Sequence, residues 1–184
     1  TAMPQYIKAG YQVTMRGIPG SALSIPNPKQ NNVVWVDYMR SLMGVYKPDV
    51  LVVELGTNDA IRGFSTATYK ARVRDVLLMA GNTPVYWVNV MTCTRWVNIS
   101  GGGAIINTTL STMAWRYTNL HVVDVNKMAC AAPQYMHTDG IHLTDPGEVA
   151  YAKLIVGSVV RPTPEVMYSI PESGPCWKKG VFSC

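Results

Sequence analysis

The chain has 184 residues, of which 48% are hydrophobic and 15% charged, a composition typical of one globular domain with a full core. The net charge of +5 comes from scattered basic residues, since only Lys178 and Lys179 are adjacent, and this argues against a nucleic-acid surface. No apolar run reaches the roughly 18–20 residues that cross a bilayer, and Thr1–Pro4 lacks a signal-peptide pattern. We therefore expect no nucleic-acid partner and no membrane span within this chain.

Short β-branched runs alternate with helical segments, and the strands are apolar on both sides, as in parallel sheets covered on both faces. Helix ends are marked by a cap at Ser65 or Thr66, by Gly81, and by Asp145-Pro146 as a cap followed by proline. The alternation predicts βαβ units, a parallel sheet and an α/β fold. In chain order the pattern predicts a helix at Met3–Ala9, a strand at Gln12–Met15, a helix at Val33–Val45, a strand at Val50–Leu55, a helix at Thr66–Met79, a strand at Val85–Met91, a helix at Ile105–Arg116, a strand at Leu120–Val125 and a helix at Gly147–Val160.

Residues 1–160 are expected to form the domain, and residues 161–184 an irregular tail packed on it, because this tail holds four prolines and little periodicity. The four cysteines include no CxxC pair, so zinc is not expected. Cys93 and Cys130 follow neighbouring predicted strands, and Cys176 and Cys184 would close a short loop. These two bridges would indicate an oxidising compartment; the alternative is four reduced, buried thiols.

Three polar segments follow predicted strands, where a parallel sheet places its reactive crevice. Val50–Leu55 runs into Gly56-Thr57-Asn58-Asp59, Gln12–Met15 runs into Arg16–Ser21, and the last strand leads to a loop with Asp139-Gly140-Ile141-His142. The strand ends therefore predict one shared site.

A carboxylate three residues before a histidine, in a turn containing Gly140, can fold back on the imidazole and fix its tautomer. Asp139 and His142 then form a general base that activates a hydroxyl nucleophile. The alternative is a surface histidine beside an ordinary turn. Asn58 can donate to an oxyanion or cap the next segment, and Asp59 is expected to be such a cap, holding the loop through backbone hydrogen bonds.

The order Gly-x-x-Gly, Gly-x-Asn-Asp and Asp-x-x-His before a C-terminal helix resembles the SGNH (GDSL-like) hydrolase family, over roughly Thr1 to Val160. The resemblance implies a flavodoxin-like three-layer α/β/α sandwich and hydrolysis of esters, lipids or acetyl groups on carbohydrates, without metal or organic cofactor. By resemblance, His142 is the general base and Asp139 orients it. Asn58 donates its side-chain amide to the oxyanion, and Gly20 donates a backbone N–H.

The sequence departs from the family in having no Gly-Asp-Ser. The resemblance places that serine, at the end of the first strand, just upstream of Thr1. We favour a chain whose first strand and serine lie on a preceding segment or on another polypeptide. A degenerate, binding-only fold and Thr1 acting through its free amine are the alternatives. Ser21 and Ser24 are expected to be turn and loop residues.

The resulting prediction is a serine esterase, acyl hydrolase or acyl transferase that acts on a lipid or carbohydrate ester through an acyl-enzyme and is secreted or associated with the cell envelope. The alternative is a degenerate module that binds carbohydrate or envelope material. Residues Thr92–Gly103 are expected to form a loop beside the substrate pocket, where Arg95 and Trp96 contact substrate; alternatively, Trp96 caps the core.

Overall fold

The computed structural model describes residues 3–26, 32 and 35–159. The predicted tail at residues 161–184, the pairing of Cys176 with Cys184, and Thr1 lie outside the described residues.

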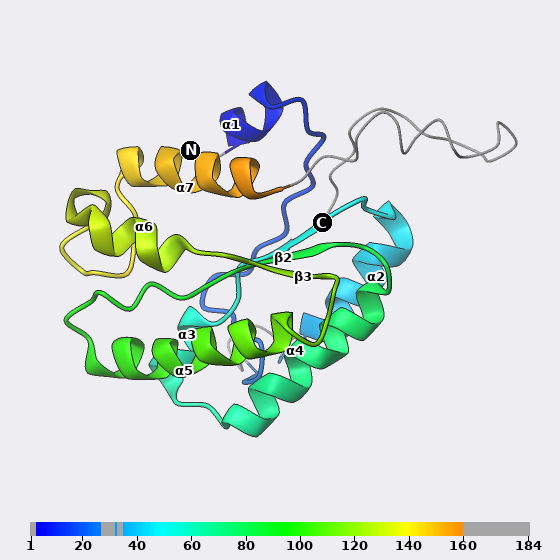
Figure 1. Cartoon of the computed structure of the whole chain (residues 1–184), viewed down its shortest axis with the longest axis horizontal. Coiled ribbons are helices and arrows are strands. Elements are labelled where there is room, and N and C mark those ends of the chain that lie inside the picture. The colour runs from blue at the N-terminus through cyan, green and yellow to red at the C-terminus, as the bar shows by residue number, and fades with distance from the viewer. Residues whose placement is uncertain (1–2, 27–31, 33–34, 160–184) are drawn as a thin grey trace, which may run out of the picture.

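The described part of the chain forms a parallel sheet in the order β1-β2-β3 (Figure 1). Strand β1 is Leu51–Val53, β2 is Val85–Val88 and β3 is Leu120–Val123. Three of the four predicted strands are therefore confirmed, each shorter than predicted. Their carboxyl ends lie on the left of Figure 1, where β3 leads directly into α6.

Helices cover both faces of the sheet, which gives the three-layer α/β architecture (Figure 1). Helices α2, α3, α4 and α5 lie on one face, and α1, α6 and α7 on the other. The bounds are α1 Met3–Lys8, α2 Trp35–Tyr46, α3 Thr57–Arg62, α4 Thr66–Ala80, α5 Val97–Ala114, α6 Val125–Ala131, the 3-10 helix η2 Pro133–Tyr135 and α7 Asp145–Ser158.

Successive strand residues face opposite layers because side chains alternate along a strand. On β2, Val85 and Trp87 pack in the core under α4 and α5, whereas Tyr86 and Val88 pack with α7. All four are buried, so both faces of this central strand are dry, as its uninterrupted apolar sequence predicts. No helix within residues 3–26 and 35–159 is long and apolar enough to span a membrane.

The predicted strand at Gln12–Met15 is wrong. Only Gln12 forms a bridge, and the residues after it carry no strand. The physical reason is that a strand needs a paired neighbour along its length, whereas this segment and β1 both line one cavity.

The predicted loop at Thr92–Gly103 is also wrong in its second half, because α5 begins at Val97. Two of its three glycines, Gly102 and Gly103, serve close packing rather than a turn. A Cβ on Gly102 would lie 3.1 Å from Ala60 Cα in α3, and one on Gly103 would lie 2.9 Å from Val90 Cγ1.

The helix-end predictions are largely confirmed. Ser65 caps α4 by accepting the N–H of Thr68, and Gly81 ends that helix. The cap of α7 is Thr144 rather than Asp145, because the Thr144 hydroxyl accepts the N–H of Gly147 at 3.3 Å.

Candidate active site

Asp139 and His142 form the polar pair that the sequence predicts. Asp139 Oδ2 lies 2.8 Å from His142 Nδ1, and Oδ1 accepts the backbone N–H groups of Ile141 at 2.8 Å and of His142 at 3.0 Å. Gly140 makes the turn at φ 68°, a left-handed conformation that glycine adopts without strain. Because the carboxylate occupies Nδ1, Nε2 is the nitrogen left to take a proton.

Electrostatics keep Asp139 ionised. The hydrogen bond from the His142 ring, followed by the two backbone N–H groups, holds the pKa of Asp139 far below its ordinary value. The His142 side chain is 75% exposed and that of Asp139 44%, so the pair is open to a reactant at the protein surface. Asp139 thus remains an oriented acceptor for the imidazolium that a general base becomes.

The backbone of His137 frames the turn. Its N–H donates to the carbonyl of His142 at 2.8 Å, and its carbonyl accepts the N–H of Gly140 at 2.9 Å. An isolated antiparallel bridge between Met136 and Leu143 closes the loop just outside these bonds. The Asp139–His142 turn is therefore a small hydrogen-bonded hairpin rather than an open loop.

Trp96 contacts this turn directly, since its indole N–H donates to the carbonyl of Asp139 at 2.6 Å. The Arg95 guanidinium lies 5.7 Å from the Trp96 ring centroid. Cys93, in the same loop, forms the predicted disulfide with Cys130, with 5.3 Å between their Cα atoms. Trp96 is 48% exposed, so it does not cap the core.

Asn58 and Gly20, expected to bind the oxyanion, lie on helix α3 and on a loop that side chains of α3 hold by hydrogen bonds. Asn58 is in the first turn of α3, and Gly20 lies at φ 72° in the loop that follows Pro19. The buried Asp59 carboxylate accepts the N–H groups of Leu23 and Ser24, each at 2.8 Å. Asp59 holds a loop through backbone hydrogen bonds, as expected, but it does not cap the next segment: it lies within α3, and the loop it holds is the upstream one that carries Gly20.

Two further residues complete this linkage. The Ser24 hydroxyl donates to Asp59 at 2.5 Å, so Ser24 is a loop residue, as expected, and Ser21 is buried in the turn. The Arg62 guanidinium, at the end of α3, donates to the carbonyl of Gly20. Sequence reasoning missed Arg62, because nothing in its local pattern indicates a partner 42 residues away.

The segment between β1 and α3 is fixed from the core. The carbonyl of Leu55 accepts the Tyr69 hydroxyl at 3.1 Å and the Trp87 indole N–H at 3.0 Å. A Cβ on Gly56 would lie 2.9 Å from Val90 Cγ2, so only glycine fits without displacement. Asn58 is therefore placed by a rigid strand-to-helix junction.

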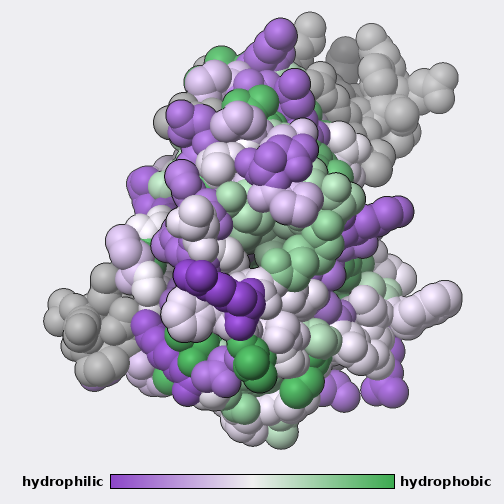
Figure 2. All heavy atoms as spheres, turned by 90° about the vertical axis from the view of Figure 1, so that its left-hand side faces the viewer, coloured by the Kyte–Doolittle hydropathy of each residue, from purple (hydrophilic) through white to green (hydrophobic). Residues whose placement is uncertain are grey.

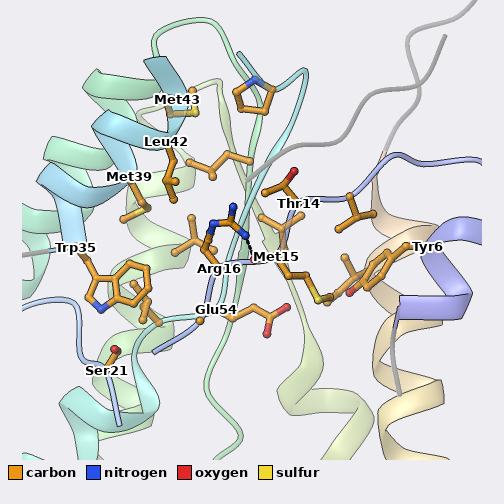
Figure 3. Close-up of a pocket in the computed structure, with 18 of the residues that line it drawn as sticks. Tyr6, Thr14, Met15, Arg16, Ser21, Trp35, Met39, Leu42, Met43 and Glu54 are labelled. Atoms are coloured by element: carbon orange, nitrogen blue, oxygen red, sulfur yellow. Dashed lines mark hydrogen bonds between the residues drawn. The ribbon is translucent and has the colours of Figure 1, made fainter. Parts of the chain in front are cut away.

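A cavity of about 420 Å³ runs along β1 and is shown in Figure 3. Its walls come from α1 and α7 on one side and from α2 on the other, and they extend from Pro48 before β1 to Asn58 after it. Arg16 reaches across toward α2, where it donates to the Tyr46 hydroxyl at 2.6 Å. Glu54 has surface open to this cavity, but enough protein surrounds its carboxyl that burial raises its pKa, an effect that a hydrogen bond with Tyr151 opposes.

The structure brings Asp139 and His142 together and ties the Asn58 helix to the Gly20 loop. Asn58 lines the cavity along β1, whereas His142 does not, so these are two clusters at the carboxyl end of the sheet. Among the described residues, no group of three or more His, Cys, Asp or Glu side chains could hold a metal ion. Figure 2 looks on to this end of the molecule, where hydrophilic and apolar residues lie side by side.

Comparisons with known proteins agree with this geometry. The model of the GDSL-like lipase/acylhydrolase family matches residues 1–150. The chain is 31% identical over 110 residues to O-acetyltransferase OatA of Staphylococcus aureus, an alignment that covers 60% of this chain but only 16% of that protein. The chain therefore spans a small part of the curated relatives that it matches.

Two solved carbohydrate esterases share the fold. The family 3 carbohydrate esterase of Clostridium thermocellum superposes with a TM-score of 0.61 at 14% identity, covering 85% of this chain and 82% of that one. Axe2, an acetylxylan esterase from Geobacillus stearothermophilus, gives 0.62 at 15% identity, covering 80% and 73%. With the family model matching most of its length and its motifs standing at the strand ends, the chain belongs to the GDSL-like lipase/acylhydrolase family.

Proposed function

We propose that this chain supplies the base and oxyanion donors of a serine-dependent acyl hydrolase or acyl transferase whose substrate is a carbohydrate or lipid ester. The observation that carries the proposal is the Asp139–His142 pair, with its 2.8 Å contact and two backbone N–H bonds to the carboxylate. A pair oriented in this way can remove a hydroxyl proton near neutral pH.

The proposed mechanism has two steps. His142 Nε2 takes the proton of a serine hydroxyl as its oxygen bonds to the ester carbonyl carbon, and the protonated ring then gives this proton to the departing alkoxide. The Asn58 amide and the Gly20 N–H stabilise the tetrahedral oxyanion, each donor being worth about 10²- to 10³-fold in kcat. In the second step, water or an acceptor hydroxyl gives its proton to His142 as it attacks the acyl-serine, and the ring returns this proton to the departing serine oxygen.

We place the serine on a segment that precedes Thr1 and lies extended in the cavity along β1. The cavity supports this because all three residues of β1 line it, and so does Asn58 beyond the end of the strand. An extended segment of about five residues spans roughly 17 Å, the scale of one strand. Helix α1, which would follow such a segment, contributes Tyr6 to the cavity and packs on α7.

The substrate class is proposed from the relatives and from the surface. OatA is named as an O-acetyltransferase, and two structural neighbours as carbohydrate or acetylxylan esterases. A strand-end face with polar and apolar residues side by side (Figure 2) suits a small acyl group on a polar carrier. The disulfide between Cys93 and Cys130 supports a secreted or envelope location.

Labelling the full-length gene product with a fluorophosphonate, followed by intact-mass analysis, tests the proposal. We expect one adduct, on a serine upstream of Thr1, and a loss of p-nitrophenyl acetate turnover of about 10³-fold or more in His142→Ala. A product that never reacts, with turnover unchanged in His142→Ala, would refute the enzyme and favour the alternative, a degenerate module that binds carbohydrate or envelope material.

A further inference from the structure

Residues Thr92–Trp96, here called the strap, join helix α6 to the Asp139–His142 turn. At its start, the Thr92 backbone N–H and hydroxyl both donate to Asn126 Oδ1 of α6, at 2.7 and 2.9 Å. Cys93 is bonded to Cys130 near the end of the same helix. The strap is thus held to α6 by two hydrogen bonds and one covalent link.

At its other end the strap holds the Asp139–His142 turn. The Trp96 indole N–H donates to the carbonyl of Asp139 at 2.6 Å. The Asp139 side chain is already committed to the ring and backbone of His142, and Trp96 fixes the backbone carbonyl of the same residue. Carbonyl and carboxylate of Asp139 are thus each held by hydrogen bonds.

Thr94 adds a steric contact to this hydrogen bond. A Cβ on Gly140 would lie only 2.8 Å from Thr94 Oγ1, so the turn and the strap pack at the closest approach that a glycine allows. The Thr94 hydroxyl in turn accepts the backbone N–H of Trp96 at 3.3 Å, which orders the end of the strap. Two adjacent residues of the turn, Asp139 and Gly140, therefore rest on two residues of the strap.

We infer that Trp96 is a positioning residue for the Asp139–His142 pair, held in place by the Cys93–Cys130 disulfide through the strap. This inference rests on the proposed function for its catalytic consequence, but its structural part does not. Trp96 acts through Asp139. The half-exposed Trp96 side chain and the neighbouring Arg95 would otherwise suggest that Trp96 contacts substrate, which is a different role.

The test uses Trp96→Phe, which keeps the ring and removes only the N–H donor. In the 184-residue chain, NMR follows the Asp139 carboxyl through an acid titration and the His142 ring nitrogens through their tautomer ratio. Besides His142, the hairpin of this turn and the strap carry three charged or titratable side chains: Asp139, His137 and Arg95. We expect the Asp139 midpoint to rise toward its ordinary value and the share of Nδ1–H tautomer to fall.

Arg95→Ala is the matched control, because it removes the cation over the ring and leaves the indole N–H in place; it should leave both NMR readouts unchanged. The double variant Cys93→Ser with Cys130→Ser should shift them in the same direction as Trp96→Phe, provided that thermal melts show both variants folded. Wild-type titration and tautomer ratio in folded Trp96→Phe would overturn the inference.

In the full-length gene product, a positioning role predicts a fall in kcat of about 10- to 100-fold in Trp96→Phe, with KM within about twofold. A rise in KM at constant kcat would instead make Trp96 a substrate contact and overturn the inference. If the NMR readouts move as expected but the product never reacts with a fluorophosphonate, the positioning stands and the proposed hydrolase fails.

Discussion

Replacing Asp59 with alanine should release the loop that carries Gly20. This carboxylate is fully buried and accepts the N–H groups of Leu23 and Ser24 and the Ser24 hydroxyl, at 2.8, 2.8 and 2.5 Å. Leaving the buried Leu23 N–H without a partner costs about 1–3 kcal/mol. The two Ser24 donors are only partly buried and can turn to water, so each loses about 0.5–1 kcal/mol. The sum is about 3 kcal/mol.

Urea unfolding of the 184-residue chain measures this cost. With a slope near 2 kcal/mol per M urea, 3 kcal/mol lowers the midpoint by about 1.5 M. Asp37→Ala is the control, since Asp37 forms an exposed ion pair with Arg40, and its loss should change stability by less than about 0.5 kcal/mol. A midpoint shift below about 0.5 M for Asp59→Ala would mean that water replaces the carboxylate and that Asp59 does not anchor the loop.

Three further changes probe other parts of the site. Gly147→Ala places a Cβ 2.2 Å from the carbonyl oxygen of Tyr135 and should lower the free energy of unfolding by about 2–3 kcal/mol, measured by thermal or urea unfolding. The control is Gly157→Ala in the same helix, whose Cβ meets nothing within 4 Å and which should stabilise the chain by about 0.5 kcal/mol. Equal effects of the two substitutions would contradict the close packing of α7 on η2. Burial raises the pKa of Glu54 above its value in the unfolded chain. Between these two pKa values the unfolded chain binds fewer protons than the folded chain, so the free energy of unfolding falls as pH rises. Glu54→Gln should therefore stabilise the chain more at pH 7 than at pH 4, and an advantage that does not grow with pH would refute this. The pKa of the Asp139 carboxyl is lowered chiefly by the His142 ring, so ¹³C NMR should still find this carboxyl ionised at pH 3. Its ionised form should stabilise the fold until the pH falls through the folded-state pKa. In His142→Ala the Asp139 titration should move up toward the ordinary pKa near 3.9.

The parts of the site that depend on local sequence were predictable. Asp139 and His142 are three residues apart with Gly140 between them, so their geometry follows from one turn. The Cys93–Cys130 disulfide followed from two neighbouring strands whose ends must be close in a parallel sheet. Asp59 was predicted to hold a loop through backbone hydrogen bonds, but local sequence could not show that its partners are Leu23 and Ser24, 36 and 35 residues upstream.

The parts that depend on distant packing were not predictable. Gly101, Gly102 and Gly103 were interpreted as loop because glycine is a poor helix former, yet the approach of Ala60 and Val90 explains Gly102 and Gly103 inside α5, while a Cβ on Gly101 would meet nothing within 4 Å. The strand predicted at Gln12–Met15 has the right apolar pattern, but its state depends on what lies along β1. Helix α3 was missed because six residues give no periodic signal.

The Asp139–His142 turn and the Asn58–Gly20 segments are each held by contacts within the described residues. Trp96 and the His137 backbone fix the turn, while Asp59 and Arg62 tie the Gly20 loop to α3. None of these bonds involves the nucleophilic serine proposed to lie upstream of Thr1. Preorganised donors and an oriented base can therefore exist before the nucleophile arrives, and most of the electrostatic stabilisation of a transition state comes from such groups. It follows that loss of the serine alone should leave the fold and both clusters intact, whereas loss of Asp59 or Trp96 should disturb them even when a serine is present.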